Sequence, residues 1–237
     1  MIAVEELSAR FARLSAAIVS DVLRTAGATH QVLHHSVKPI AFGRTLAGPA
    51  FCVKGERILG GAPKRTGPSP RHEMFRRAGP GAIIVVESGG YEDCVVFGEN
   101  VALAFRISGS QGIVTDGGIR DSNAMANLGI PVFSRFTTPL SSGGQWAMTE
   151  LEVPLRLAGQ SSASVTVRPG DILLGDSDGV VVVPRHAAES VLEDSEQLAE
   201  IEKQVHEGLL SGRDPGEVFE SVSRFGHIRR IDGLCID

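Results

Sequence analysis

The sequence predicts an α/β fold, built as a single domain over residues 1–237. The 237 residues, of which 42% are hydrophobic and 22% charged, are enough to bury a sizeable core. From residue 95 onward, short helical and extended patterns alternate, which is typical of α/β domains. No repeat, low-complexity tract or linker divides the chain, and only the polar residues 213–237 stand apart, as a C-terminal tail without a clear period.

The spacing of apolar residues predicts the elements in order, since a period of three to four indicates a helix and an apolar or alternating run a strand. Helices are predicted over residues 5–26 (one helix or two in tandem, closed by Gly27), around His72–Arg77, and over Gly98–Ile107, Ser122–Leu128 and Ala187–Leu210. Strands are predicted over Leu46–Val53, Ile83–Glu87, Gly112–Thr115, Pro131–Phe133, Leu151–Leu157, Ser164–Val167, Ile172–Leu174 and Val180–Val183. The last helix is long enough to pack across another surface, such as a second subunit.

Charge and cysteine content narrow the kind of protein. A net charge of −5 argues against a nucleic-acid or acidic-membrane surface, which needs clustered positive charge. The 3 cysteines are too few and too scattered for a disulfide framework or a Cys-x-x-Cys metal site. Without a signal-like N-terminus or an apolar run of membrane length, we expect a cytoplasmic protein with small-molecule partners.

Several sites are excluded by their missing motifs. No glycine-rich stretch has the spacing of a P-loop or of a dinucleotide-binding turn, so nucleotide cofactors lose support. None of the four lysines lies in an apolar run, which disfavours imine chemistry. His30 and His34 are four apart, but the turn residues after Gly27 make a helical metal pair there less plausible than a solvated loop.

Residues 113–121, Ile-Val-Thr-Asp-Gly-Gly-Ile-Arg-Asp, are the most informative segment. An apolar strand ends at Asp116, two glycines turn the backbone, and Arg120 and Asp121 arrive at the start of the next helix. In a structural interpretation, Asp121 caps that helix, which stabilises by about 1 kcal/mol, and Arg120 is an exposed cation.

In a functional interpretation of the same segment, the helix starts at Gly98 and Ser122 direct free N–H groups toward one point, where Arg120 offers a fork to a carboxylate. Asp121 and Glu99 then supply oxygen ligands to Mg²⁺, which takes only one or two carboxylates and keeps several waters. An anion cradle beside a divalent metal suits a 2-oxo acid.

The chain also resembles a known family. The resemblance covers roughly residues 10–212 and rests on Ser20–Leu23, Leu46–Ala50, Gly98-Glu99, the run from Gly109 to Asp121, Pro131–Phe133, Pro169–Asp171 and Asp176–Pro184. These blocks resemble the family that joins the divalent-metal 4-hydroxy-4-methyl-2-oxoglutarate aldolases to the regulator of ribonuclease activity A proteins. The resemblance implies a swivelling-type β/β/α domain with a long C-terminal helix, assembling as a homotrimer or a dimer of trimers.

The resemblance also implies roles for individual residues. Arg120 would bind the pyruvyl unit and Asp121 the metal, Mg²⁺ or Mn²⁺, while Glu99 would hold a water on that metal. The backbone at Gly98, Asn100 and Val101 would receive the substrate carboxylate. A glutamate from the closing helix of a neighbouring subunit would complete the site, and the alignment favours Glu202 over Glu200. The regulator proteins lack the aspartate after the arginine, whereas this chain retains it.

The sequence departs from the family in the basic stretch from Lys54 to Arg71, predicted as a long loop. There Arg57, Lys64 or Arg65 would meet a second substrate carboxylate or a neighbouring subunit; a solvated loop is the alternative.

The leading functional hypothesis is a metal-dependent lyase that releases pyruvate from 4-hydroxy-4-methyl-2-oxoglutarate or a related 4-hydroxy-2-oxo acid, with oxaloacetate decarboxylation at the same site. The alternatives are a non-catalytic regulator that docks on an RNA-processing enzyme and a related lyase acting on another oxo acid.

Overall fold

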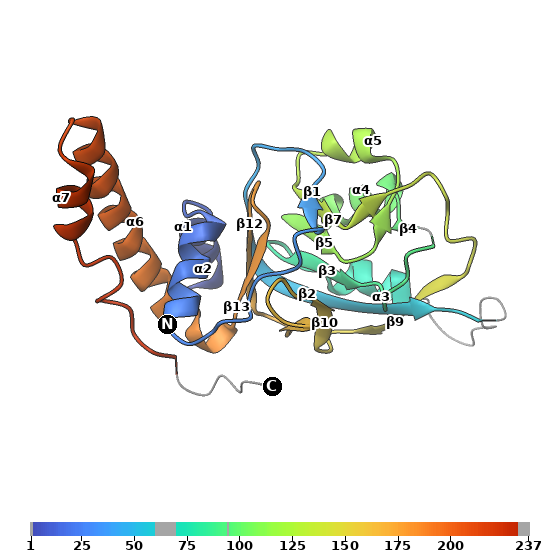
Figure 1. Ribbon diagram of the computed structural model, residues 1–237. Coiled ribbons are helices and arrows are strands. Elements are labelled where there is room, and N and C mark those ends of the chain that lie inside the picture. Colours follow the sequence, from blue (N-terminus) through green and yellow to red (C-terminus); the bar gives the residue numbers. More distant parts are fainter. Residues whose placement is uncertain (1, 60–69, 94, 232–237) are drawn as a thin grey trace.

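The computed structural model describes residues 2–59, 70–93 and 95–231 and confirms the α/β fold (Figure 1). A central sheet has the strand order β1-β7-β5-β3-β2-β12-β13, and β9 also pairs with β2. Its strands are β1 (Lys38–Pro39), β2 (Leu46–Arg57), β3 (Ile83–Glu87), β5 (Gly112–Thr115), β7 (Val132–Ser134), β9 (Trp146–Leu151), β12 (Ile172–Gly175) and β13 (Val180–Val183). A hairpin of β10 (Leu155–Ala158) and β11 (Ser164–Val167) lies beside it.

Strand β2 joins the parts of this sheet. It pairs with β12 over Leu46–Pro49, in parallel with β3 over Ala50–Lys54, and with β9 from Val53 to its end. Because β9 supplies hydrogen-bond partners, β2 runs to Arg57, so the first four residues of the predicted basic loop are strand. Residues 60–69 of that loop lie outside the described part of the chain.

Four parallel strands set the edge on which the site is built. Strands β2, β3, β5 and β7 run in the same direction, so their carboxyl ends meet on one side of the sheet. A second, three-stranded parallel sheet stands beyond this edge, formed by β4 (Val95–Phe97), β6 (Gly118–Ile119) and β8 (Phe136–Thr137). Helices α3 (Pro70–Arg77), α4 (Glu99–Ile107) and α5 (Ser122–Ala126) share one hydrophobic cluster with it, in which Phe105, Ile119 and Met125 are fully buried.

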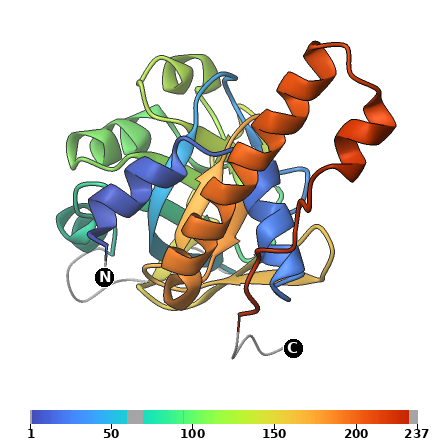
Figure 2. The ribbon, with the colours of Figure 1, turned by 90° about the vertical axis from the view of Figure 1, so that its left-hand side faces the viewer.

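The opposite end of the molecule is helical. The predicted helical stretch 5–26 is two helices, α1 (Val4–Phe11) and α2 (Ala16–Thr25), and Gly27 follows with φ 100°. The Ser15 side chain starts α2 by accepting a hydrogen bond from the Ile18 N–H. After a short 3₁₀ turn (Arg185–Ala187), the long helix α6 (Ala188–Leu210) crosses this end between α1 and α2 (Figure 2). In the described ranges, no helix is long and apolar enough to span a membrane.

Two predictions about the second half are wrong. The strand predicted over Leu151–Leu157 is interrupted, because Glu152 adopts φ 57° and Pro154 cannot donate to a ladder, so β9 ends and β10 begins there. The segment after Gly212 is not wholly irregular. It contains helix α7 (Pro215–Glu220), which Asp214 caps by accepting the Glu217 N–H at 3.0 Å. Figures 1 and 2 show α7 beside the outer end of α6, away from the body.

Candidate functional site

The turn that carries Arg120 and Asp121 starts at the carboxyl end of β5 and is fixed from its first residue. Asp116 is 9% exposed, and its Oδ1 accepts a hydrogen bond of 2.7 Å from the N–H of Ser88, which directly follows β3. Thr115 Oγ1 accepts the Gly117 N–H at 3.0 Å. Burial raises the pKa of Asp116, and the hydrogen bonds from Ser88 offset part of that rise. The turn is therefore tied to two neighbouring strand ends.

Two glycines allow a close approach that no other residue permits. A Cβ at Gly118 would overlap the Phe136 ring, where β6 pairs with β8. A Cβ at Gly98 would lie 2.6 Å from Asp121 Oδ2 and 3.1 Å from Arg120 Nε. The backbone of Gly98 thus lies directly against both side chains of the Arg-Asp pair, and this is the physical reason for glycine before Glu99.

Asp121 has an unusual backbone and a different partner from the one predicted. It is one of two non-glycine residues with positive φ in the described ranges, at φ 60° and ψ 35°, a conformation that costs on the order of 1–3 kcal/mol. Its side chain makes no cap bond to α5; Oδ2 accepts the N–H of Glu99 at 3.2 Å instead. Asp121 therefore occupies the predicted N-cap position of α5, but its side chain does not cap that helix, because the left-handed backbone turns the carboxylate toward α4.

Arg120 lies beside this carboxylate, with its Nε 3.6 Å from Asp121 Oδ2. Both side chains remain more than a third exposed, at 42% and 46%, so water screens this contact and it adds little to stability. A guanidinium left accessible and only loosely paired is available to a ligand anion.

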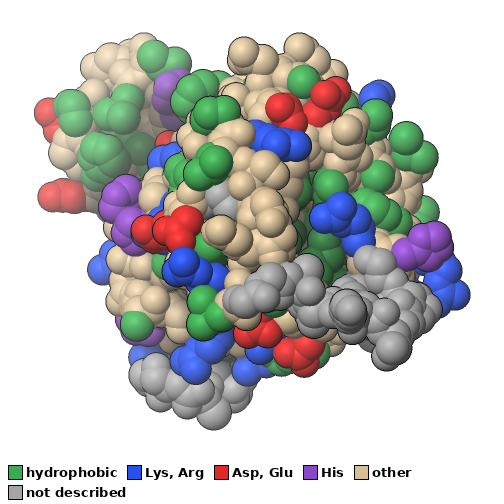
Figure 3. All heavy atoms as spheres, turned by 90° about the vertical axis from the view of Figure 1, so that its right-hand side faces the viewer, with side chains coloured by type: hydrophobic (Ala, Val, Ile, Leu, Met, Phe, Trp, Pro, Cys, Tyr) green, Lys and Arg blue, Asp and Glu red, His purple; other side chains and the backbone are tan. Residues whose placement is uncertain are grey.

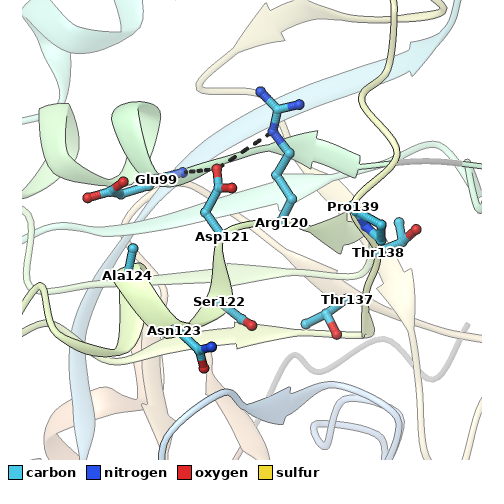
Figure 4. Close-up of a pocket in the computed structure, with 9 residues that line it drawn as sticks. All are labelled: Glu99, Arg120, Asp121, Ser122, Asn123, Ala124, Thr137, Thr138 and Pro139. Atoms are coloured by element: carbon cyan, nitrogen blue, oxygen red, sulfur yellow. Dashed lines mark hydrogen bonds and ion pairs between the residues drawn. The ribbon is translucent and has the colours of Figure 1, made fainter.

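The pair opens onto a hollow of about 550 Å³ (Figure 4). It is lined by Glu99, Arg120, Asp121, Ser122, Asn123, Ala124, Thr137, Thr138 and Pro139. In Figure 4, Glu99 reaches Asp121 through its backbone nitrogen, while its carboxylate points away from Asp121 in that view. The structure thus brings Glu99, Arg120 and Asp121 to one hollow without pairing the two carboxylates.

The predicted backbone anion site lies at the start of α4. Gly98 is the residue before the helix, and Asn100 and Val101 are in its first turn. The Val101 N–H donates to Gly98 O at 3.1 Å, so this N–H already has a hydrogen-bond acceptor within the turn. The roles of Gly98, Asn100 and Val101 toward a carboxylate stay predictions.

Glu202 lies far along α6, at the other end of the molecule, where its Oε1 accepts from Arg224 Nε at 2.7 Å. From there Glu202 can reach this hollow only in another copy of the chain, and the prediction likewise assigned it to a neighbouring subunit. The choice between Glu202 and Glu200 stays open.

Sequence reasoning missed four polar residues of the hollow: Ser122, Asn123, Thr137 and Thr138. The two threonines come from the end of β8 and are brought to Arg120 by the β6–β8 pairing, in which the Thr138 N–H donates to Ile119 O at 3.1 Å. A two-residue strand has no readable period, so no sequence signal placed them there.

The donor set fits a hydrated divalent cation and not a closed metal centre. Among the residues the structure describes, no group of three or more His, Cys, Asp and Glu side chains could hold a metal ion. The hollow offers the Asp121 carboxylate as a hard oxygen donor, and the Glu99 carboxylate, which points away from Asp121, could act through a water; Mg²⁺ takes only one or two carboxylates while keeping several waters. Gly98 leaves the Asp121 carboxylate the space that a Cβ would occupy.

Other candidates have local partners. His30 Nδ1 lies 3.0 Å from Ser161 Oγ and His34 Nδ1 lies 2.8 Å from Ser36 Oγ, so the two histidines do not face a common ion. Arg57 pairs with Asp93 at 3.2 Å. Lys64 and Arg65 fall outside the described residues. On the face shown in Figure 3, acidic and basic side chains are interspersed outside the grey atoms.

Comparisons with known proteins show the family to which the chain is related. Residues 16–182 match the model of the RraA-like family, described as Aldolase/RraA. An uncharacterised protein of Methanocaldococcus jannaschii is 34% identical over 134 residues, which are 56% of this chain and 61% of that protein. A protein of Halalkalibacterium halodurans, provisionally named 4-hydroxy-4-methyl-2-oxoglutarate aldolase, is 31% identical over 189 residues, 78% of this chain and 79% of that one.

Among solved structures, RraAS2 of Streptomyces coelicolor is described as an unusual member of the RNase ES inhibitor RraA protein family. It is 28% identical to this chain and superposes with a TM-score of 0.68, covering 84% of this chain and 96% of that one.

Proposed function

The chain belongs to the RraA-like family, Aldolase/RraA, and we propose that it is a lyase that cleaves the C3–C4 bond of a 4-hydroxy-2-oxo acid and releases pyruvate. The observation that carries this proposal is the contact of Arg120 and Asp121 with the Gly98 backbone at the rim of one hollow. It supports the proposal because a cation suited to an anionic substrate lies next to a carboxylate suited to a metal, in a turn whose shape is fixed by buried contacts.

Arg120 binds the substrate. Its guanidinium offers a planar fork to the carboxylate and keto oxygen of the pyruvyl unit. Because Arg120 is paired only at 3.6 Å with Asp121, little must be broken before it turns to a ligand. In the transition state it shares the negative charge that develops on the enolate oxygen.

Asp121 would hold Mg²⁺ or Mn²⁺, and Glu99 would hold a water on that metal. A divalent cation at this position supplies Lewis-acid stabilisation of the enolate, worth several kcal/mol. The strained φ of Asp121 directs its carboxylate into the hollow instead of along α5, and the Glu99 N–H keeps it there.

In this proposal, the two glutamates take part in proton transfer. Glu99, acting through a water, takes the proton from the C4 hydroxyl, so that C4 becomes a carbonyl and the C3–C4 electrons pass to the pyruvate enolate. A proton then returns to C3. In this proposal Glu202 of a second subunit helps to position that water, within a trimer or a dimer of trimers. Oxaloacetate, which loses CO₂ through the same enolate, is expected to react as well.

Pyruvate release tests the proposal directly. The full chain should release pyruvate from 4-hydroxy-2-oxo acids, 4-hydroxy-4-methyl-2-oxoglutarate included, and from oxaloacetate when Mg²⁺ or Mn²⁺ is added, and EDTA should stop it. Turnover that persists after chelation, or absence of turnover on the whole set, would rule the proposal out.

A second candidate is a regulator that docks on an RNA-processing enzyme, and the likeness to RraAS2 favours it. It predicts binding to such an enzyme with equal affinity for the wild type and for Asp121→Asn. If wild type and Asp121→Asn bind the RNA-processing enzyme specifically and with equal affinity, and neither has lyase activity, the regulator is the correct candidate.

A further inference from the structure

The hollow extends beyond the groups that the proposed reaction uses. Its volume of about 550 Å³ is within the range of sites that take ligands larger than a three-carbon acid. Once Arg120, Asp121 and Glu99 are assigned to the pyruvyl unit and the metal, its remaining polar lining is neutral: Ser122, Asn123, Thr137 and Thr138. This neutral wall therefore faces the part of the substrate beyond C4.

The wall has hydrogen-bonding capacity to offer. In the described part of the chain, no hydrogen bond is found for the hydroxyls of Ser122 and Thr137, and Figure 4 shows both at the rim of the hollow. Asn123 uses its backbone carbonyl, which accepts from Asn127 Nδ2 at 3.0 Å, and is exposed. Hydroxyl and amide groups both donate and accept, so they match alcohol groups of a ligand.

The charges of the hollow disfavour a second carboxylate. Arg120 is the cation among the nine lining residues, and the other two charged ones, Glu99 and Asp121, are acidic. With Arg120 occupied by the pyruvyl carboxylate, and the charges of Glu99 and Asp121 compensated by the proposed metal, a distal carboxylate finds no cationic side chain of its own among these nine residues. Arg57 does not line the hollow; it is paired with Asp93 at 3.2 Å and lies over the Tyr91 ring.

We propose that the substrate carries an uncharged, hydroxylated tail beyond C4, and that Ser122, Asn123 and Thr137 select it by hydrogen bonding. This inference rests on the proposed lyase function and narrows its substrate class to 4-hydroxy-2-oxo acids with alcohol groups. Cleavage then yields pyruvate and a hydroxyaldehyde: the C3–C4 bond breaks, the C4 hydroxyl loses its proton, and C3 gains one.

Two five-carbon substrates of equal length test the tail directly. 4,5-Dihydroxy-2-oxopentanoate ends in an alcohol and 4-hydroxy-2-oxoglutarate ends in a carboxylate, and both release pyruvate, so one assay reads both. We expect kcat/KM for the alcohol substrate to be at least roughly tenfold higher, since unmatched polar groups are rejected strongly by a hydrogen-bonding site. An equal or reversed preference overturns this inference and leaves the lyase function standing; no pyruvate from either substrate means that the lyase function itself has failed.

Variants of the wall residues test which side chains determine the preference between the two substrates. Thr137→Val keeps the side-chain shape and removes the hydroxyl, so kcat/KM for the alcohol substrate should fall several-fold while that for the carboxylate substrate changes little. Asn123→Arg adds a cation to the wall and should raise kcat/KM for the carboxylate substrate. Thr25→Val, at an exposed position of α2, is the matched control. If Thr137→Val and Ser122→Ala lower kcat/KM equally for both substrates, the wall does not select the tail and the inference is wrong.

Discussion

Two regions of this molecule hold carboxylates by opposite means: the turn over residues 116–121, and the C-terminal arm, which we define as α6 beyond Leu198 together with α7. In the turn, Asp121 is fixed by a left-handed backbone, by the contact with Gly98 and by the buried Asp116 five residues earlier. In the arm, Glu202 is about one third exposed and pairs with Arg224 from the segment after α7.

The packing of the two regions differs in the same way. Only a few side chains of the arm are buried, such as Val205 and Val218, and Val218 rests on Gly208 within the arm itself. Leu210 and Phe219 are 75% and 49% exposed. The geometry of the turn is therefore complete within one chain, whereas the position of Glu202 relative to any site depends on what the arm meets.

The largest effect is expected from removing the charge of Asp121 in the turn. Asp121→Asn keeps the size of the side chain and a residue type that tolerates positive φ, but it removes the charge that would bind the metal. We expect pyruvate release to fall by about 10²–10⁴, the equivalent of losing several kcal/mol of metal stabilisation, with Tm nearly unchanged. Asp214→Asn, which also removes one charge and keeps a cap, is the control. Full activity in Asp121→Asn would contradict the assignment.

The arm is tested by separating the two partners of its ion pair. Glu202→Gln and Arg224→Gln both break the pair, and at this exposure each should cost less than about 1 kcal/mol of stability. If Glu202 completes the site of a neighbouring subunit, only Glu202→Gln should lower kcat, by about 10². Equal kcat values in the two variants would remove Glu202 from the site and direct attention to Glu200.

A smaller effect is expected from crowding the turn. Gly98→Ala places a methyl group 2.6 Å from Asp121 Oδ2, so the carboxylate must move by several tenths of an ångström. A misplaced catalytic group typically costs up to about 10² in rate, and we expect roughly a tenfold fall in kcat/KM together with weaker activation by Mg²⁺. Gly79→Ala, whose Cβ meets nothing within 4 Å, should behave as wild type. Identical kinetics for both variants would show that the close approach is not needed.

The smallest effect concerns the buried start of the turn and its pH dependence. Because burial raises the pKa of Asp116 above its unfolded value, the folded state binds this proton more tightly, and the stability it contributes is lost as pH rises through the folded pKa. Asp116→Asn does not titrate and can still accept the Ser88 N–H. Its Tm should therefore match wild type at acid pH and exceed it by a few degrees at neutral pH. A Tm difference that stays constant across pH would argue that Asp116 is not desolvated.

The sequence predicted the elements whose pattern is long or strongly apolar. Strands β3 and β5 and helix α6 were placed to within one or two residues, because continuous burial and a sustained period of 3.6 are local properties. Helix α7 was missed, although Asp214 at the cap and Pro215 in the first turn are helix-start signals. Its six residues are too few to show a helical period, so the cap residues are the only local signal of this helix.

The site was predictable only in part, and for a physical reason. The residues of the Arg120-Asp121 turn are adjacent in sequence, and Gly98-Glu99 stood out beside them through the family resemblance. The partner of Asp121 was not predictable, since a left-handed residue redirects a side chain that the helix-cap rule assigns to α5. Thr137 and Thr138 reach the hollow through tertiary pairing of two-residue strands, which carries no signal in either strand.

The backbone at residue 121 also limits how this protein can change over generations. Left-handed φ is free of a steric penalty for glycine, is tolerated by aspartate and asparagine better than by other residues, and penalises branched or bulky side chains. Of these three, only aspartate brings a charge. A single replacement by either of the others would leave the turn intact and remove the proposed metal ligand, so under this proposal a folded form without catalysis lies one substitution away.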